Sequence, residues 1–166
     1  MDAGLMVIRL VFGLVMAAHG AQKLFGWFGG YGIAGTGPYF ESLGFRPGRL
    51  FAALAGLGEF AGGLLVALGF LGPIGPALVL SVMIVAAVIS HWGKGLFAMT
   101  NGIELPLLYS AAAVGVALSG PGRFSVDAIV GLTSTPILAV IALGIGVAGA
   151  IVNLTLRRTP AAVATA

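Results

Sequence analysis

Five long apolar stretches, separated by polar or glycine-rich segments, set the pattern of the sequence. They cover residues 5–25, 50–70, 73–92, 105–119 and 136–156. A helix needs about 20 apolar residues to cross the hydrocarbon core of a bilayer. Apolar and polar residues do not alternate along these stretches, as they would in the strands of a membrane barrel. Because a helix satisfies its own backbone hydrogen bonds in lipid, the pattern predicts five membrane-spanning helices.

The composition is that of a membrane protein. Of the 166 residues, 59% are hydrophobic and only 8% are charged, whereas about 25% are charged in soluble domains. These values exclude an ordinary soluble enzyme and a disordered regulator. They also exclude binding to nucleic acid, because no basic residues cluster beyond Arg157 and Arg158. The chain has no cysteine, which excludes disulfides, thiolate metal sites and a cysteine nucleophile.

The distribution of Lys and Arg predicts how the chain is oriented. If the N-terminus lies outside, the inner side receives Lys23, Arg46, Arg49, Lys94, Arg157 and Arg158, and the outer side receives Arg9 and Arg123. Cytoplasmic loops carry the excess of Lys and Arg. We therefore expect a multi-pass protein of the cell (plasma or inner) membrane, with its N-terminus outside and its C-terminus inside. Asp2 and Arg9 argue against a cleaved signal peptide at the start.

Polar residues within the first apolar stretch are candidates for function. Spacings of three and four residues put one set on a single helix face: Arg9, Phe12, Met16, His19 and Lys23. A charge inside the bilayer costs at least a few kcal/mol, so this face should point into the bundle. Lys23 lies near the helix end and could instead extend to the headgroups.

Glu59 lies near the middle of the second stretch. A carboxyl group at that depth needs either a partner or a proton. At 1.5 Å per residue, Glu59 lies about 15 Å, His19 about 9 Å and Arg9 about 24 Å below the membrane side of segment 26–47. We therefore expect His19 or Arg9 to be the partner. A protonated Glu59 bonded to a neighbouring backbone is the alternative.

Several polar side chains should converge beneath segment 26–47. The first and third helices run parallel, and the fourth begins on the same membrane side. The converging group is Gln22, Lys23, His19, His91, Asn101, Glu104 and Tyr109. For some of them a structural role is the alternative. Glu104, for example, lies in the first turn of its helix, where the helix dipole stabilises a carboxylate.

Segment 26–47 combines many glycines with aromatic residues that suit the headgroup zone, namely Trp27, Phe28, Tyr31, Tyr39 and Phe40. A short interfacial helix at residues 38–44 could cover the converging group, and passive anchoring is the alternative.

Two histidines, His19 and His91, are expected on one membrane side and suggest haem or metal binding. Nothing in their spacing makes them face each other across an iron, and further metal ligands are too few, so we expect no metal.

Glycine patterns in two helices predict close packing. Gly56, Gly58, Gly62 and Gly63 surround Glu59 at spacings that let helices approach. Residues 144–149 match a dinucleotide-binding fingerprint, but they lie within an apolar helix and follow no strand. Asn153 begins a glycosylation sequon at a helix end expected in the cytoplasm, and we assign it no function.

The chain resembles the DoxX family of small membrane proteins. Motifs in matching order carry the resemblance: HGAQKLFGWFGG at 19–30, Gly35-Thr36, Phe40 with Ser42-Leu-Gly44, Glu59 with Gly62-Gly63, Asn101-Gly102 with Glu104-Leu-Pro106, and PGRFSVD at 121–127. The resemblance implies an all-α, four-helix membrane core over residues 1–132. This chain adds a further transmembrane helix over 133–158 and a tail at 159–166 that we expect to be disordered.

The resemblance also implies a redox function. Family members resemble a subunit of thiosulfate:quinone oxidoreductase, and others are linked to membrane complexes that handle thiols and superoxide. We therefore expect a membrane subunit of a quinone-linked redox module, with quinone as cofactor. The alternatives are a small-solute carrier and a non-catalytic scaffold. Whether the chain is an enzyme on its own stays open.

Each candidate residue has an expected role within that module. His19 and Lys23 would bind a quinone carbonyl or an anionic sulfur substrate, and Glu59 would relay protons or act as a counter-ion. The expected binding residues are Arg9, Gln22, His91, Asn101, Glu104 and Tyr109. The expected partners are the lipid bilayer and either soluble redox proteins or further copies of this chain.

Overall fold

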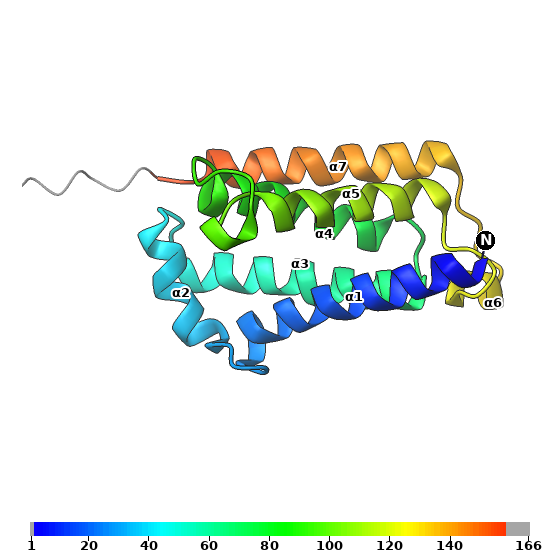
Figure 1. The fold of residues 1–166 in the computed structure, drawn as a ribbon, viewed down its shortest axis with the longest axis horizontal. Coiled ribbons are helices and arrows are strands. Elements are labelled where there is room, and N and C mark those ends of the chain that lie inside the picture. The colour runs from blue at the N-terminus through cyan, green and yellow to red at the C-terminus, as the bar shows by residue number, and fades with distance from the viewer. Residues whose placement is uncertain (1, 159–166) are drawn as a thin grey trace, which may run out of the picture.

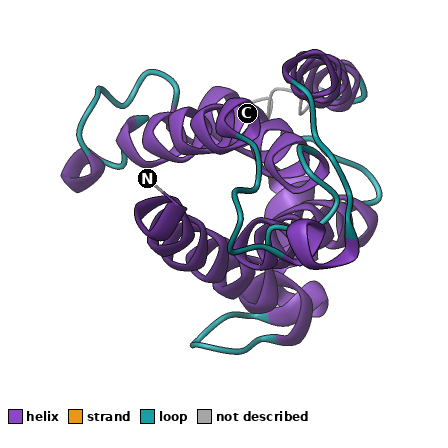
Figure 2. Cartoon of the chain, turned by 90° about the vertical axis from the view of Figure 1, so that its right-hand side faces the viewer, coloured by secondary structure: helices purple, strands orange, loops and turns teal. Residues whose placement is uncertain are grey.

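The computed structural model describes residues 2–158, and its regular structure there is entirely helical (Figures 1 and 2). Five long helices lie side by side: α1 (Asp2–Phe25), α3 (Gly48–Leu68), α4 (Ile74–Ala86), α5 (Glu104–Ser119) and α7 (Pro136–Thr155). Two short helices, α2 (Gly32–Ser42) and α6 (Val126–Val130), lie at opposite ends of this bundle. A π-helical turn, η1 (Ala87–His91), continues α4, and a 3-10 turn, η2 (Ala98–Thr100), precedes α5. The predicted all-α bundle is confirmed.

Four helices are long and apolar enough to cross a membrane, namely α1, α3, α4 together with η1, and α7. Helix α5 has 16 residues and is therefore about 24 Å long, shorter than the hydrocarbon core of about 30 Å. It nevertheless runs beside the other long helices (Figure 1). The described part of the chain is that of a polytopic membrane protein, with four helices long enough to span the bilayer where the sequence predicted five, and α5 is a shorter apolar helix beside them.

Glycines bring α1 and α3 into close backbone contact. A Cβ atom at Gly63 would lie 2.5 Å from both the Ala17 nitrogen and the Gly13 oxygen. A Cβ atom at Gly13 would be equally close to the backbone of Gly63 and Ala67. Only glycine fits at such a crossing. The predicted packing role of the α3 glycines is confirmed, and this contact sets the depth of α1 relative to α3.

Helix α7 packs on α4 through a glycine as well. A Cβ atom at Gly146 would lie 2.5 Å from the Ala77 oxygen, whereas nothing lies within 4 Å of one at Gly144. The dinucleotide-like pattern at 144–149 therefore serves helix packing at Gly146, as its position in an apolar helix predicted.

The end of the bundle that carries the N-terminus is fixed by Asp127. Its carboxylate is 2% exposed and accepts hydrogen bonds from the backbone nitrogens of Leu71 at 2.9 Å and Gly72 at 2.7 Å. Ser125 caps α6 by accepting a hydrogen bond from the Ala128 nitrogen. A buried carboxylate is stable when several donors satisfy it, and here it ties α6 to the loop between α3 and α4.

The opposite end is covered by α2. This helix begins at Gly32, earlier than the predicted helix at 38–44. Its glycines lower the intrinsic helix propensity, which is why the sequence indicates a loop there. Tertiary packing outweighs that preference, because Gly37 is buried against Arg49 at the start of α3.

The C-terminal end of α7 holds the turn that follows α2. The Arg157 Nε atom donates a hydrogen bond to the Leu43 oxygen at 2.7 Å, and the Arg158 nitrogen donates one to the Gly44 oxygen at 2.8 Å. The residues that follow α7 therefore contact the segment that covers the bundle end. The tail predicted at 159–166 lies outside the described residues.

We predict that Gly63→Ala lowers the thermal stability of the detergent-purified protein. The added methyl group overlaps the α1 backbone, and overpacking of this kind costs about 1–3 kcal/mol. The matched control is Gly144→Ala, where the surroundings are open and alanine favours the helix. Equal melting temperatures for the two variants would contradict the role of this contact.

Candidate functional site

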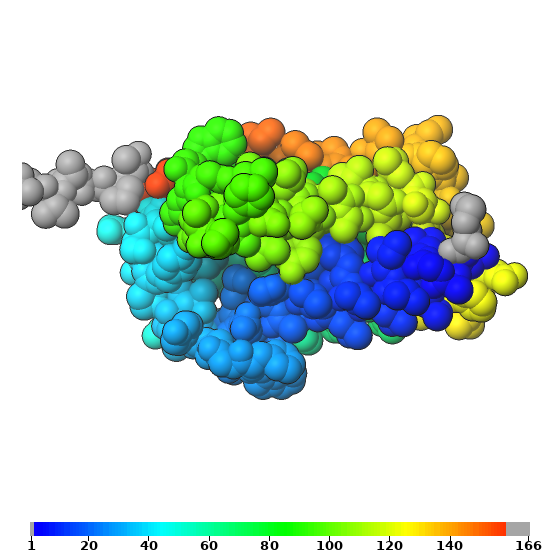
Figure 3. Space-filling model, in the orientation of Figure 1, coloured from blue at the N-terminus to red at the C-terminus, as the bar shows by residue number. Residues whose placement is uncertain are grey.

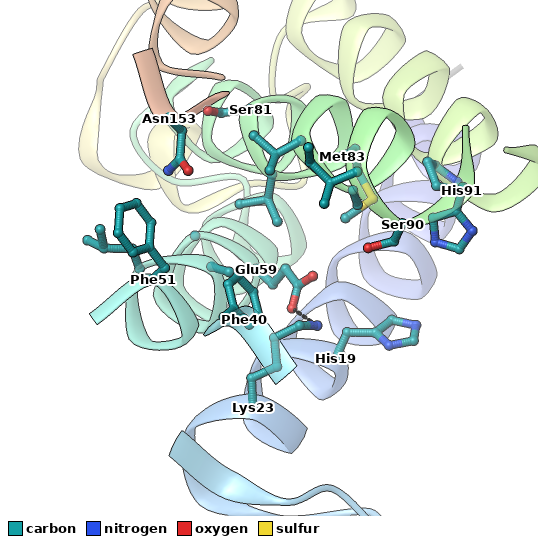
Figure 4. Close-up of a pocket in the computed structure, with 18 of the residues that line it drawn as sticks. His19, Lys23, Phe40, Phe51, Glu59, Ser81, Met83, Ser90, His91 and Asn153 are labelled. Carbon is teal, nitrogen blue, oxygen red and sulfur yellow. Dashed lines mark hydrogen bonds and ion pairs between the residues drawn. The ribbon is translucent and has the colours of Figure 1, made fainter. Parts of the chain in front are cut away.

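A cavity of about 460 Å³, which we call the central pocket, lies among α1, α3, α4, α5 and η1 beneath α2 (Figure 4). Its wall is mostly apolar. The polar or titratable residues that line it are His19, Lys23, Tyr39, Glu59, Ser81, Ser90, His91, Asn101, Tyr109 and Asn153. At this end of the bundle, α2 and segment 92–104 lie next to each other in the space-filling view (Figure 3).

Lys23 and Glu59 form an ion pair at the wall of the central pocket. The Lys23 Nζ atom donates a hydrogen bond to the Glu59 Oε2 atom at 2.6 Å (Figure 4). The Glu59 side chain is 5% exposed and the Lys23 side chain is 26% exposed. The partner of Glu59 is therefore Lys23, and the expectation of His19 or Arg9 is wrong.

The direction of the side chains explains this correction. Side chains on a helix tilt toward its N-terminus, so Lys23, near the C-terminal end of α1, extends down into the membrane. Glu59 lies on the antiparallel α3 and tilts upward toward the α2 end. The depth calculation from Cα positions left out both the tilt and the length of the lysine side chain. Lys23 therefore does not extend away to the headgroups.

His19 lies beside the ion pair, on the same face of α1 (Figure 4). Its ring packs edge-on against Tyr109 of α5, with centroids 6.2 Å apart. Tyr109 in turn stacks on Phe12 at 6.0 Å. These aromatic contacts fix the imidazole at the pocket wall and place a phenol next to it.

His91 and Asn101 also line the pocket. The His91 Nδ1 atom lies 2.9 Å from the Asn101 carbonyl oxygen. A carbonyl only accepts, so Nδ1 carries the hydrogen in this bond, and Nε2 of the neutral ring is left as an acceptor. The residue sits at the end of the π-helical turn η1, and such turns are frequent at functional sites.

Helix α2, which covers the central pocket, contacts η1 through a pair of hydroxyl groups. The Tyr39 hydroxyl of α2 lies 3.3 Å from the Ser90 hydroxyl. Phe40 and Leu43 from the same segment also line the pocket. The prediction that segment 26–47 covers the polar group agrees with this geometry.

Three of the predicted site residues do not line the central pocket, namely Gln22, Glu104 and Arg9. Gln22 donates a hydrogen bond to the Phe28 oxygen at 3.1 Å and lines a separate, smaller cavity. Glu104 accepts one from the Ala98 nitrogen at 2.7 Å, so it stabilises η2. The convergence predicted for Gln22 and Glu104 is therefore wrong, while His19, Lys23, His91, Asn101 and Tyr109 do converge.

Arg9 lies far from the pocket, at the other end of α1. It is 2% exposed, and its guanidinium donates hydrogen bonds to the carbonyl oxygens of Pro121 and Phe124, the latter at 2.7 Å. The structure thus places Arg9 in the contact between α1 and the loop before α6. The buried positive charge is stable there because these backbone carbonyl oxygens accept hydrogen bonds from the guanidinium.

The sequence reasoning missed Ser81, Ser90 and Asn153, which all line the pocket. Asn153 had a usable signal, because it follows Gly146 and Gly149 at intervals of three and four residues on the face of α7 that packs on α4. A Cβ atom at Gly149 would lie 3.4 Å from the Ser81 hydroxyl. Figure 4 shows Ser81 and Asn153 on the side of the pocket away from His91.

Although His19 and His91 both line the pocket, residues 2–158 contain no group of three or more His, Asp or Glu side chains that could hold a metal ion.

Comparison with known proteins yields a family match. The DoxX family model matches residues 4–92, the part of the chain from α1 to the end of η1. His19, Lys23, Glu59 and His91 all lie within it. No curated protein and no solved structure matches the chain.

We predict that Lys23→Met destabilises the protein strongly while the double variant Lys23→Met/Glu59→Gln is close to wild type. The single change leaves a buried carboxylate without its partner, which costs about 3 kcal/mol or more, whereas removal of both charges is often nearly neutral. Thermal unfolding in one detergent measures both variants. Equal destabilisation of the two would contradict the pairing.

Proposed function

The chain belongs to the DoxX family, and from this premise we propose that it is a membrane subunit of a quinone-linked redox module that serves thiosulfate or thiol oxidation or the response to oxidative stress. The observation that supports the proposal is the central pocket itself. An ion pair and two histidines lie at the wall of a mostly apolar cavity of about 460 Å³ between membrane helices. Sites for small organic ligands are of this kind, apolar with a few polar groups that fix the orientation.

The residues of the pocket fit a quinone headgroup. Its carbonyl oxygens need donors, and Lys23 and His19 can supply them. Apolar side chains such as Met16 and Met83 suit the flat ring. When bound, a quinone would supply reversible chemistry of two electrons and two protons.

The ion pair would keep Lys23 charged, so that it can donate hydrogen bonds to the quinone. Glu59 balances the ammonium of Lys23, which can then donate hydrogen bonds inside the membrane without an isolated charge. Glu59 can also hold a proton close to the ligand. The neutral tautomer of His91 leaves Nε2 as a further proton acceptor.

The pocket also provides separation from water and access from lipid. Tyr39 and Phe40 cover it from α2. Leu54 and Leu78 line it and are also 47% and 38% exposed on the outside of the bundle. An isoprenoid tail could therefore extend between α3 and α4 into the bilayer while the headgroup stays at Lys23.

We predict that Leu54→Trp abolishes photolabelling of the pocket by an azido derivative of a short-chain ubiquinone. The larger ring occupies space that the ligand needs. Leu57→Trp is the matched control, because Leu57 is 52% exposed on the same helix and does not line the pocket. Mass spectrometry of the labelled peptides locates the adduct. The proposal would be contradicted if the unchanged protein were not labelled, or if Leu57→Trp abolished the labelling as well.

We also propose that the protein lies in the plasma or inner membrane with its N-terminus outside. The structure gathers α2, segment 43–49, segment 92–104 and residues 156–158 after α7 at one end of the bundle (Figure 1). These segments carry Arg46, Arg49, Lys94, Arg157 and Arg158, and such an excess of positive charge favours the cytoplasmic side.

We predict that a cysteine at Leu132 is labelled by a membrane-impermeant maleimide in right-side-out vesicles, and that one at Ala34 is labelled only after the vesicles are permeabilised. The chain has no cysteine of its own, so each variant, Leu132→Cys and Ala34→Cys, reports one position. Both positions are exposed. The reverse pattern would show that the orientation is inverted.

A further inference from the structure

A second cavity, of about 210 Å³, lies under the loop that follows α1. We call it the side cavity. It is lined by Gln22, Lys23, Gly29, Gly30, Tyr31 and Thr36. Within residues 2–158, Lys23 is the titratable residue that lines both this cavity and the central pocket.

The two cavities differ in size and in the groups that line them. The residues of the side cavity include an amide, two hydroxyl groups and glycines, whereas the larger central pocket lies among the long helices. Gln22 holds the loop in place through its hydrogen bond to the Phe28 oxygen. Tyr31 is 82% exposed at the side cavity. A cavity that opens to the surface and offers Gln22, Lys23 and Thr36 as hydrogen-bond partners can hold water.

The ion pair lies between these two environments. Glu59 is nearly inaccessible at 5% exposure and its carboxylate bonds to Lys23, which is 26% exposed. Any proton that passes from the side cavity to Glu59 therefore meets Lys23 first. Among the other titratable groups near the pair, Tyr31 lines the side cavity. The rest line the central pocket: His19 on α1, Tyr39 on α2, His91 on η1 and Tyr109 on α5.

We propose that the side cavity is a water-filled vestibule from which protons reach Glu59 through Lys23. The Lys23 ammonium transfers one proton to the Glu59 carboxylate, and the resulting amine takes one proton from a hydronium ion in the side cavity. The net result moves one proton from water to Glu59, and no electron moves. The use of that proton by a ligand in the central pocket rests on the proposed function, but the transfer itself does not.

Obstruction of the side cavity tests the route. The protein in lipid nanodiscs is subjected to a pH jump, and infrared spectroscopy follows the carboxyl band of Glu59, identified by its loss in Glu59→Gln. We expect Thr36→Phe, which fills the cavity, to slow the response at least tenfold, and Thr36→Leu to slow it less. Ala34→Phe, an equally bulky change on α2 outside the cavity, should respond at the wild-type rate.

Several outcomes would overturn the route. They are an unchanged rate in both Thr36 variants, an equal delay in Ala34→Phe, and a Glu59 band in the wild type that never responds to pH. If Thr36→Phe fails to assemble, Thr36→Leu decides alone. The measurement needs no quinone, so a failed photolabelling experiment with an intact rate pattern would reject the proposed function and leave the proton route standing.

Discussion

A carboxyl group in the middle of a bilayer must have a counter-charge or stay protonated, and the arrangement of this protein depends on how Glu59 meets that condition. Lys23 supplies the counter-charge from α1. It reaches Glu59 because glycines bring the backbones of α1 and α3 together at Gly13 and Gly63. The central pocket lies against this pair, and α2 closes over it. The packing of two helices and the chemistry of the site therefore have one origin.

The sequence alone predicts the features that follow from the free energy of transferring residues into lipid. Apolar length predicted the helices, and the cost of intramembrane charge identified Glu59, His19 and Lys23 as belonging to the interior. The face of α1 was predicted correctly as well, since Phe12 and Met16 are buried on it. These features depend on periodicity and solvation, which are properties of each segment on its own.

The remaining features depend on contacts between segments. The choice of Lys23 as partner follows from side-chain tilt in antiparallel helices. Helix α2 forms despite its glycines because α3 packs on it. Asn153 becomes part of the pocket through the register between α4 and α7, and Arg9 belongs to a loop contact that lies more than a hundred residues away in sequence. Local patterns give at most the helix face, as the glycine spacing does for Asn153, and the partner across the contact comes only from the fold.

The hydrogen bonds from the end of α7 to Leu43 and Gly44 have a consequence for biogenesis. A ribosome releases α1 and α3 early, so Lys23 and Glu59, 36 residues apart, can neutralise each other while the rest of the chain is still being translated. Asn153 and Arg157 are translated after them. The two charges can thus be paired before the pocket gains the part of its wall that α7 supplies and before the turn after α2 is anchored.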